Sequence, residues 1–341
     1  MAPDRLTPVV AITVGDCNGI GPEVALKGAS SRAVRRLCKP VLIGSPKVFD
    51  FYARKLSLPG RMTLSRDNHL HSNRTHVLPV LSVPHEKEPV IRPGRVSASA
   101  GRHAAAAIRY AVALALEGKV DALVTAPVSK KALHMAGDAF PGQTEMLAHL
   151  TGSGSTAMML VSDVMRVGLV TIHIPLRDVA ATLNRTLLGK KISVIHDALR
   201  FDWRIRQPRV AVLGLNPHAG EQGDLGSEEQ RLLLPVISSL RRKGMSIAGP
   251  FPADSFFGKY TPGSFDAVVA MYHDQGLVPL KMSSFGRGVN FTAGLNIVRT
   301  SPDHGTAFDI AGKGLADPRS MIEAIALAVA IARNRKAVKN R

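Results

Sequence analysis

The chain has 341 residues, 45% hydrophobic and 21% charged, which is typical of a soluble globular protein with a large core. No apolar stretch reaches the roughly 18 residues of a membrane span, and the start of the chain has no signal-peptide pattern. The two cysteines, Cys17 and Cys38, form no disulfide or metal-binding pattern, so these features together predict a cytoplasmic protein.

Lys and Arg (44) outnumber Asp and Glu (26), which gives a formal net charge of +18. A basic surface can serve nucleic acid or small anions. Here the cations are scattered, and aromatic residues make up only 5% of the chain, so few rings stand among them to stack on bases. The charge therefore favours a small anionic substrate over nucleic acid.

Strand-like and helix-like segments alternate along the chain. Short apolar runs predict buried strands at 9–14, 40–44, 76–81, 122–125, 157–161, 167–172, 267–271, 288–292 and 296–300, with another just before His218. Amphipathic patterns predict helices at 46–56, 99–117, 187–201 and 320–333, and one that ends at Lys243. This alternation predicts a largely parallel sheet with helices on both faces.

The first predicted strand runs into the segment GDCNGIGPE, residues 15–23. Its glycines permit tight turns, and Pro22 suits the first position of a helix. Asp16 and Asn18 place polar groups beyond the end of the strand. The segment is compatible with a phosphate or cofactor loop, but it is neither a Walker loop nor a GxGxxG fingerprint.

Three apolar strands each run into a histidine: His173, His218 and His273. In open α/β sheets the chemistry lies beyond the carboxyl ends of the strands, and imidazole is a common ligand for divalent metals. A single strand-end histidine is more often bonded to nearby backbone. The threefold repetition favours a metal site assembled by folding, with coordination positions left for a substrate.

Cationic and amide side chains follow the last of these histidines. Lys281, Asn290 and Arg299 lie in the next part of the chain. Beside a metal, such donors suit an acidic or phosphorylated substrate. Any one cation could instead be an ordinary surface charge, and we favour that interpretation for Arg287.

The chain closely resembles one family through a series of ordered motifs. They are GDCNGIGPE, TAPVSKKALHMAG, PGQTE, HIPLRDV, GLNPHAGEQGDLGSEE, AMYHDQGLVPLK, FGRGVN and RTSPDHGTAFDIAGKGLADP. This series is similar to that of the 4-hydroxythreonine-4-phosphate dehydrogenases of pyridoxal phosphate biosynthesis. The resemblance runs from about residue 9 to residue 330, and so many motifs in order make it specific.

The resemblance implies an architecture. The family has a two-lobed α/β/α fold like that of isocitrate and isopropylmalate dehydrogenases, with the active site in the cleft between the lobes. We expect one lobe from residues 1–135 with 280–341, and a second lobe from residues 136–279 that holds the metal histidines and dimer contacts. The family forms homodimers whose active sites use residues of both subunits.

The resemblance also implies roles for particular residues. The family's divalent-metal ligands (Zn, Mg, Co or Mn) correspond to His173, His218 and His273. Its substrate-binding positions correspond to Gln143, Thr144, Lys281, Asn290 and Arg299. The loop 303–318 is similar to the adenine-binding loop of isopropylmalate dehydrogenases, so NAD or NADP is expected at Asp303, His304, Gly305, Thr306, Asp309 and Gly312.

The implied reaction is an oxidation followed by a decarboxylation. A metal lowers the pKa of the substrate hydroxyl, a base takes its proton, and hydride passes to NAD. The resulting β-keto acid then loses CO₂ while the metal stabilises the enolate. Lys281 and Asp274 are the candidates for moving protons, and the sequence does not rank them. Lys281 could equally bind phosphate or carboxylate without transferring a proton.

The chain departs from the family pattern at three points. Cys17 and Asn18 replace the Pro-Ala of the usual GDPAGIGPE, Gln143 replaces the histidine of the usual GHTE, and Asn296 stands where proline is usual. Gln keeps hydrogen-bonding capacity but cannot carry positive charge. The retained Lys281 and Arg299 still favour a phosphorylated substrate, whereas Gln143 leaves its identity open.

Several alternatives therefore remain. Paralogues of the family oxidise threonate or erythronate 4-phosphate, and another branch oxidises a cis-dihydrodiol dicarboxylate from terephthalate breakdown. From other classes, a basic nucleic-acid-binding protein and a phosphate acyltransferase of related fold are possible, and neither would need NAD. The strand-end histidines and the DHGTAFDIAGKG loop argue against both.

Overall fold

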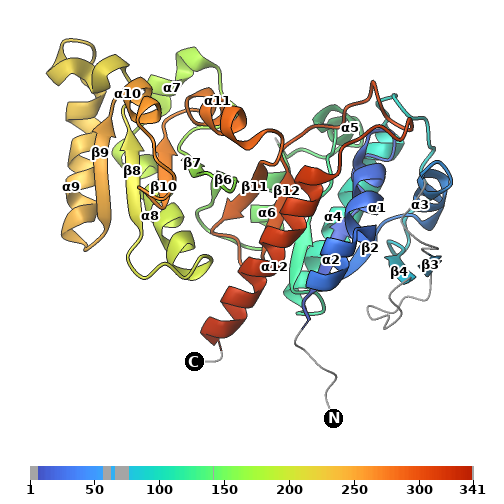
Figure 1. The fold of residues 1–341 in the computed structure, drawn as a ribbon. Coiled ribbons are helices and arrows are strands. Elements are labelled where there is room, and N and C mark those ends of the chain that lie inside the picture. Colours follow the sequence, from blue (N-terminus) through green and yellow to red (C-terminus); the bar gives the residue numbers. More distant parts are fainter. Residues whose placement is uncertain (1–6, 57–62, 66–76, 141, 340–341) are drawn as a thin grey trace. The chain divides into compact units, whose positions relative to one another are not determined.

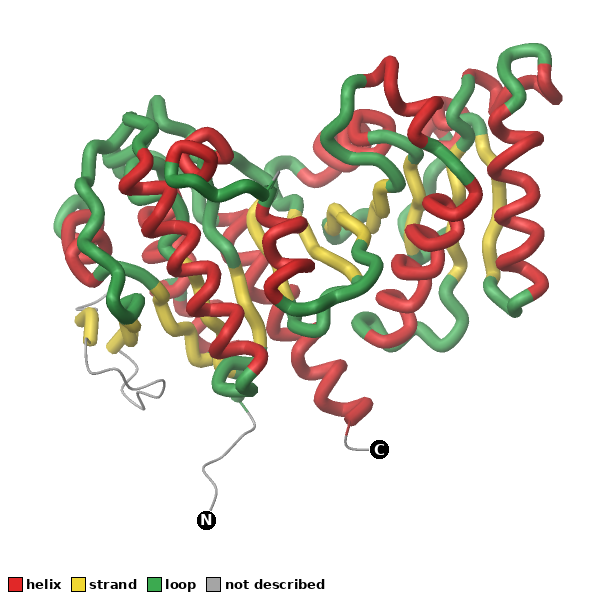
Figure 2. The backbone as a smooth tube through the Cα atoms, turned by 180° about the vertical axis from the view of Figure 1, so that it is seen from behind, coloured by secondary structure: helices red, strands yellow, loops and turns green. Residues whose placement is uncertain are grey.

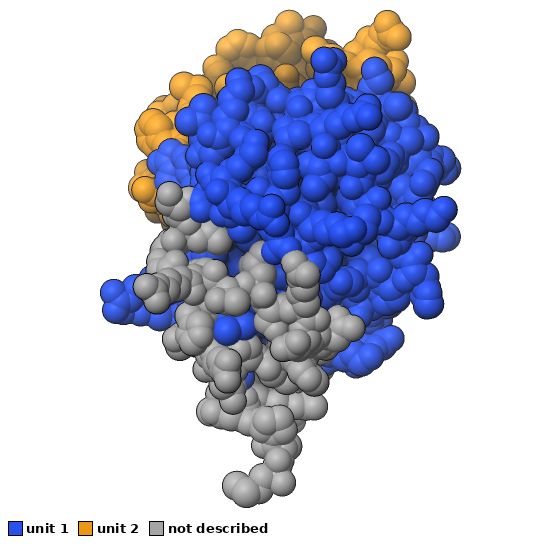
Figure 3. All heavy atoms as spheres, turned by 90° about the vertical axis from the view of Figure 1, so that its right-hand side faces the viewer, with its two compact units in different colours: residues 1–153, 295–333 blue, residues 154–294, 334–341 orange. Residues whose placement is uncertain are grey.

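The computed structural model describes residues 7–56, 63–65, 77–140 and 142–339. The chain forms two compact units, which Figure 3 distinguishes by colour: residues 1–153 with 295–333, and residues 154–294 with 334–341. Helices pack beside strands in both units (Figure 2). No helix within the described ranges is long and apolar enough to span a membrane.

The first unit contains a parallel sheet with the strand order β3-β4-β2-β1-β5-β12. The strands are β1 (Val9–Thr13), β2 (Lys39–Ile43), β3 (Thr63–Ser65), β4 (Val77–Leu81), β5 (Ala122–Val124) and β12 (Arg299–Pro302). Val10 of β1 pairs with Pro40 on one side and Ala122 on the other. All five residues of β1 are buried, which explains its continuous apolar sequence.

Helices cover both faces of this sheet (Figure 1). They are α1 (Gly21–Ser30), α2 (Arg32–Leu37), α3 (Pro46–Ala53), α4 (Ala98–Leu116), α5 (Lys130–Met135), α6 (Gln143–Leu150) and α12 (Arg319–Lys339), the last of which belongs to this unit up to Arg333. Gly28 of α1 lies against Met321 of α12, whereas Gly101 of α4 lies against Ala132 of α5. Because crossovers between parallel strands are right-handed, α1 and α4 lie on opposite faces.

The second unit contains a mixed sheet with the order β11-β6-β7-β10-β8-β9. Its strands are β6 (Ala157–Val161), β7 (Arg166–Leu169), β8 (Arg209–Leu213), β9 (Ser246–Phe251), β10 (Ala267–Ala270) and β11 (Val289–Ala293). β6 is antiparallel to both β11 and β7, whereas β7, β10, β8 and β9 are parallel. The three strands that precede His173, His273 and His218 are therefore parallel neighbours, and their carboxyl ends lie at one edge.

The helical segments of this unit also divide between the two faces. They are η1 (Leu176–Asp178), α7 (Val179–Thr182), α8 (Arg185–Phe201), η2 (Pro217–Gly223), η3 (Glu229–Leu233), α9 (Leu234–Arg242), α10 (Ala253–Gly258) and α11 (His273–Ser284). Leu277 and Leu280 of α11 join a buried cluster with residues of β7, β8 and β10. One face of α11 is therefore buried against the sheet.

The division between the units differs from the sequence prediction, which placed it after residues 135 and 279. In the structure the divisions follow residues 153 and 294. The reason is helix packing: α6 packs on α4 of the first unit, whereas α11 packs on β7 and β10 of the second. Lys281 therefore belongs to the same unit as the three histidines.

Candidate functional site

His173 and His273 lie together at the carboxyl edge of the second unit's sheet. They follow the neighbouring strands β7 and β10, and their ring centroids are 5.8 Å apart. A metal lies about 2.1 Å from each coordinating imidazole nitrogen, so rings at this separation are close enough to share one ion. The donor chemistry of this pair fits the expected divalent metal.

His218 follows β8, the other parallel neighbour of β10, but in a different setting. It lies in η2, where the backbone is left-handed, with a φ of 51° at His218. Among the described residues, no three His, Cys, Asp or Glu side chains form a group with metal-binding spacing. The fold thus brings His218 to the same edge of the sheet without completing a three-histidine group.

Asp274 contacts the histidine that precedes it in α11. The Nδ1 atom of His273 lies 2.7 Å from Oδ1 of Asp274, whose side chain is 79% exposed. A carboxylate accepts hydrogen bonds, so this contact favours the tautomer with the proton on Nδ1. Nε2 of His273 is then the nitrogen available to a metal.

Lys281 and Asn290 lie farther along in the same unit. Lys281 is exposed in the last turn of α11. Asn290 lies on β11, where it pairs with Leu160 of β6, and its Oδ1 atom is buried without a hydrogen-bond partner among the described residues. Buried polar atoms in folded proteins are usually satisfied, so Asn290 is a candidate to contact a bound molecule.

Arg299 and Gln143 are joined in the first unit. Arg299, at the start of β12, is only 2% exposed, and its Nε and Nη2 donate to Oγ1 of Thr125 at 3.1 and 2.7 Å. Nη2 also donates to Oε1 of Gln143 at 2.9 Å. Burial lowers the pKa of Arg299 to about 10, so the guanidinium stays charged at neutral pH. Thr144 follows in α6 and is half-buried.

The expected cofactor loop, 303–318, is held by the first turns of α1. Oε1 of Glu23 accepts from the backbone N–H of Ala316 at 2.8 Å and from Nζ of Lys27 at 2.7 Å. The same ammonium donates to the carbonyl oxygens of Gly314 and Ala316. Sequence analysis missed both residues of this pair, although the i, i+4 spacing of Glu23 and Lys27 could have indicated it.

Within this loop, His304 is the residue best suited to meet a bound group. Its Nδ1 lies 3.2 Å from the carbonyl oxygen of Gly305, and its Nε2 is buried without a partner among the described residues. Burial lowers the pKa of His304, so the ring is neutral at physiological pH. An unsatisfied ring nitrogen fits a cofactor that offers a hydrogen bond, as adenine does. Asp303 and Thr306 are half-buried nearby in sequence, and Asp309 is exposed.

Close backbone approach explains several glycines. A Cβ at Gly19 would lie 2.8 Å from the carbonyl oxygen of Thr306, and one at Gly21 would lie 2.7 Å from that of Val14. Of the three glycines expected to permit turning, only Gly15 has a positive φ, at 70°. Gly312 combines a φ of 74° with a Cβ position 3.1 Å from Pro93. Gly19 thus lets the first loop pack directly on the expected cofactor loop.

Asp16 is a buried acid in this first loop. Its Oδ1 accepts from the backbone N–H of Asn18 at 2.9 Å, whereas its Oδ2 has no partner among the described residues. Burial raises the pKa of Asp16 to about 6. Its backbone N–H donates to Pro127 in the loop after β5, so Asp16 lies where the strand order of the sheet reverses, a common position for ligand sites in α/β folds.

The chain is similar to known proteins over nearly its whole length. The model of a family described as pyridoxal phosphate biosynthetic protein PdxA matches residues 36–328. A 4-hydroxythreonine-4-phosphate dehydrogenase of Bacteroides thetaiotaomicron is 40% identical over 332 residues, which covers 97% of this chain and 90% of the relative. A D-threonate 4-phosphate dehydrogenase of Cupriavidus necator is 44% identical over 322 residues, covering 93% and 95%.

A solved structure extends the comparison to the fold. The crystal structure of a 4-hydroxythreonine-4-phosphate dehydrogenase from Klebsiella pneumoniae matches this chain with a TM-score of 0.86 and 42% identity. The match covers 96% of this chain and 99% of the other. The α/β fold predicted from the sequence is therefore confirmed.

The raised pKa of Asp16 gives a stability prediction. Because the folded state favours the protonated acid, the stabilisation it provides is complete below about pH 4 and is lost as the pH rises through about 6. Asp16→Asn should therefore raise the free energy of unfolding near pH 8 by up to about 3 kcal/mol and change it little near pH 4. Urea unfolding at both pH values measures this, with exposed Asp309→Asn as the control. A variant less stable than the wild type near pH 8 would contradict the prediction.

Proposed function

Because the chain belongs to the family of the pyridoxal phosphate biosynthetic protein PdxA, we propose that it is a metal- and NAD(P)-dependent dehydrogenase that decarboxylates a phosphorylated 3-hydroxy acid. The substrate most like that of its relatives is 4-hydroxythreonine 4-phosphate, which would yield 3-amino-2-oxopropyl phosphate and CO₂. The pairing of His173 with His273 beyond adjacent strands is the observation that carries the proposal.

His173 and His273, with His218 as the third ligand, would hold the divalent metal. When bound, such an ion polarises the substrate's hydroxyl oxygen and lowers its pKa. The contact between Asp274 and Nδ1 of His273 supports a ligand role for Nε2. This contact supports Asp274 as a residue that orients a ligand, and we propose Lys281 as the residue that moves the proton.

The loop 303–318 would hold NAD or NADP, which accepts hydride from the substrate carbon. Its backbone is fixed by Glu23 and Lys27, and His304 would direct Nε2 to the cofactor. A loop fixed before binding loses little conformational freedom when the cofactor binds. This arrangement supports a dinucleotide site that uses no GxGxxG sequence.

Gln143 bears on the choice of substrate. Arginine has only donors, so the atom of Gln143 that faces Arg299 must be its oxygen, and the amide nitrogen faces elsewhere as a donor. A neutral donor suits a substrate oxygen, as found in a hydroxyl or phosphate group. Threonate 4-phosphate has a hydroxyl group where 4-hydroxythreonine 4-phosphate has an ammonium group, so a neutral donor would suit it as a second candidate, in line with the Cupriavidus relative.

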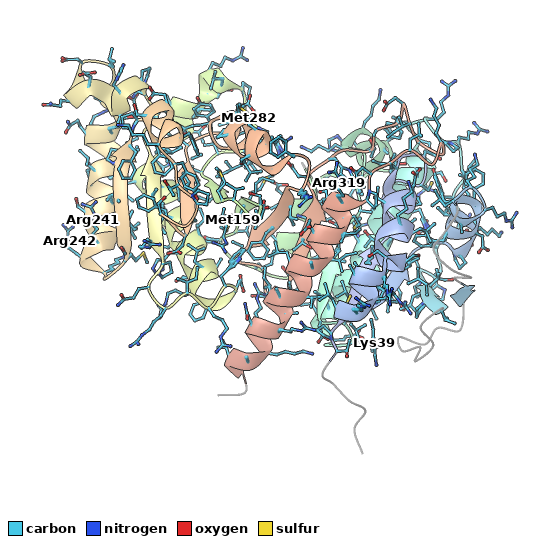
Figure 4. The ribbon with its side chains drawn as sticks, in the orientation of Figure 1. Lys39, Met159, Arg241, Arg242, Met282 and Arg319 are labelled. Carbon is cyan, nitrogen blue, oxygen red and sulfur yellow. The ribbon has the colours of Figure 1, made fainter. Side chains whose placement is uncertain are left out.

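The proposed enzyme is a homodimer. Val278, Met282 and Phe285 recur at helical spacing along α11 and its end, with exposed fractions of 54%, 73% and 79% (Figure 4 labels Met282). Exposed apolar side chains at this spacing are typical of a protein interface. We propose that a second copy of the chain covers it. An NAD-dependent reaction on a phosphorylated acid also suits the expected cytoplasmic location.

The reaction is tested by measuring NADH formation with Mn²⁺ on a panel of acids. We expect turnover of 4-hydroxythreonine 4-phosphate or threonate 4-phosphate, with erythronate 4-phosphate as a further comparison. Gln143→His should add a pH dependence of KM near pH 6.5, because imidazole titrates there and an amide does not. Turnover confined to the terephthalate dihydrodiol would contradict a phosphorylated substrate.

The proton-transfer assignment is tested with Lys281→Met and Asp274→Asn. The first should lower kcat by about 100-fold or more, since general acid–base groups contribute at least that much. The second should weaken metal binding about 10-fold or more through His273. Steady-state kinetics and calorimetric titration with Mn²⁺ measure the two effects. Arg287→Met, which removes an exposed cation nearby in sequence, is the matched control and should change neither.

The interface prediction concerns α11. Met282→Lys places a charge in the centre of the apolar face and should shift the dimer towards monomer, measured by light scattering after gel filtration. Leu116→Lys at the end of α4, where leucine is 52% exposed, serves as the control. A Met282→Lys protein with the wild-type mass would show that this face is not the interface.

A further inference from the structure

The segment that carries His218 has an unusual backbone. Five consecutive residues of η2 have left-handed φ angles: His218 (51°), Ala219 (52°), Gly220 (82°), Glu221 (41°) and Gln222 (57°). Residues other than Gly seldom adopt this region, although Asn, Asp and His do so more often than the rest, and they rarely adopt it in succession. Surrounding contacts must therefore hold the turn.

A buried carboxylate supplies those contacts. Glu229, only 2% exposed, opens the π-helical turn η3 that follows the segment. Its Oε1 accepts from the backbone N–H groups of Leu215 and Asn216 at 2.7 and 2.8 Å, and its Oε2 accepts from Nδ2 of Asn216 at 2.9 Å. A Cβ added to Gly220 would lie 2.6 Å from Oε2 of Glu229. The carboxylate therefore contacts both the entrance and the middle of the left-handed turn.

The chemistry of this pocket requires a carboxylate at position 229. All three groups that face it are N–H donors, and a carboxylate accepts from all of them. An amide would direct its NH₂ group at either the two backbone donors or Nδ2 of Asn216. Asn216 could not relieve the clash by flipping, because its oxygen would then face Oε2 of Glu228, which now accepts from Nδ2 at 2.8 Å.

The entrance of the segment is also tied to the His273 strand. Nε2 of Gln275 donates to the carbonyl oxygen of Gly214 at 2.6 Å, and its Oε1 accepts from the N–H of Met271 at 2.7 Å. Gly214 begins the His218 segment, and Met271 lies two residues before His273. The side chain of Gln275 thus links the start of the His218 segment to the strand end that carries His273.

We infer that Glu229 is a positioning residue, which holds the left-handed turn 218–222 and so sets where His218 lies relative to His273. The consequence for metal binding rests on the proposed role of His218 as a ligand. The hold on the turn itself does not depend on any bound metal. The two parts can therefore be tested separately in the full-length protein.

The first measurement is hydrogen–deuterium exchange of the metal-free protein in peptides that cover residues 214–226. Glu229→Gln should accelerate exchange of the Leu215 and Asn216 amides by about tenfold or more, because in either orientation the NH₂ group of Gln faces an N–H donor, which disrupts the hydrogen bonds that hold this segment. Glu228→Gln is the matched control, since Glu228 accepts from the same Asn216 side chain but not from these two amides. Wild-type exchange in Glu229→Gln would overturn the inference.

The second measurement is calorimetric titration with Mn²⁺. Glu229→Gln should weaken binding about 10- to 100-fold, as residues that orient metal ligands typically do, while Glu228→Gln binds like the wild type. His218→Ala gives the loss of Mn²⁺ affinity expected when this ligand is removed completely. Equal affinity in His218→Ala and the wild type would refute the metal role of His218 and leave the exchange result to decide the role of Glu229. If Glu229→Gln does not fold, Glu229→Asp replaces it, with the same direction expected in both measurements.

Discussion

Two buried glutamates, one in each unit, accept hydrogen bonds from the backbone of the loops on which the proposed chemistry depends. Glu23 binds the N–H of Ala316 in the expected cofactor loop, and Glu229 binds two N–H groups before the His218 turn. Both are almost fully buried. A buried carboxylate is costly unless it is hydrogen-bonded, so each loop and its glutamate stabilise one another. Neither carboxylate is a candidate to react, but each one stabilises a loop that carries candidate site residues.

The order of elements could be predicted from the sequence because buried parallel strands are read directly from apolar runs. The same runs placed His173, His218 and His273 at strand ends, and the structure puts their strands side by side. The conformation of the segments after the strands could not be predicted. The sequence predicts only a helix that ends at Lys243, whereas in the structure Glu229 turns back into the preceding loop and accepts from the N–H of Leu215. Such contacts depend on tertiary packing, which no local pattern records.

The residues at which the chain departs from the family pattern have different structural roles. Asn18 is fully buried, and its amide donates to Arg95 and Ser97 while its Oδ1 accepts from the N–H of Arg92. Its role is therefore to hold the adjacent loop. Burial raises the pKa of the neighbouring Cys17 to about 12, which leaves an unreactive thiol. Gln143 differs, because its amide meets the buried cation Arg299 and keeps a donor for another molecule. Of these three residues, only Gln143 bears on the proposed choice of substrate.

The left-handed turn at 218–222 also has a consequence for how the protein can be engineered. Four of its five residues are not glycine, although glycine would adopt these angles with less strain. At three of these four positions, Ala219, Glu221 and Gln222, no part in the proposed chemistry is assigned. Replacing such residues with glycine would relieve backbone strain and gain folding free energy there. Glycine would also make the turn more flexible. The same substitutions would therefore raise thermostability but hold the imidazole of His218 less firmly in place.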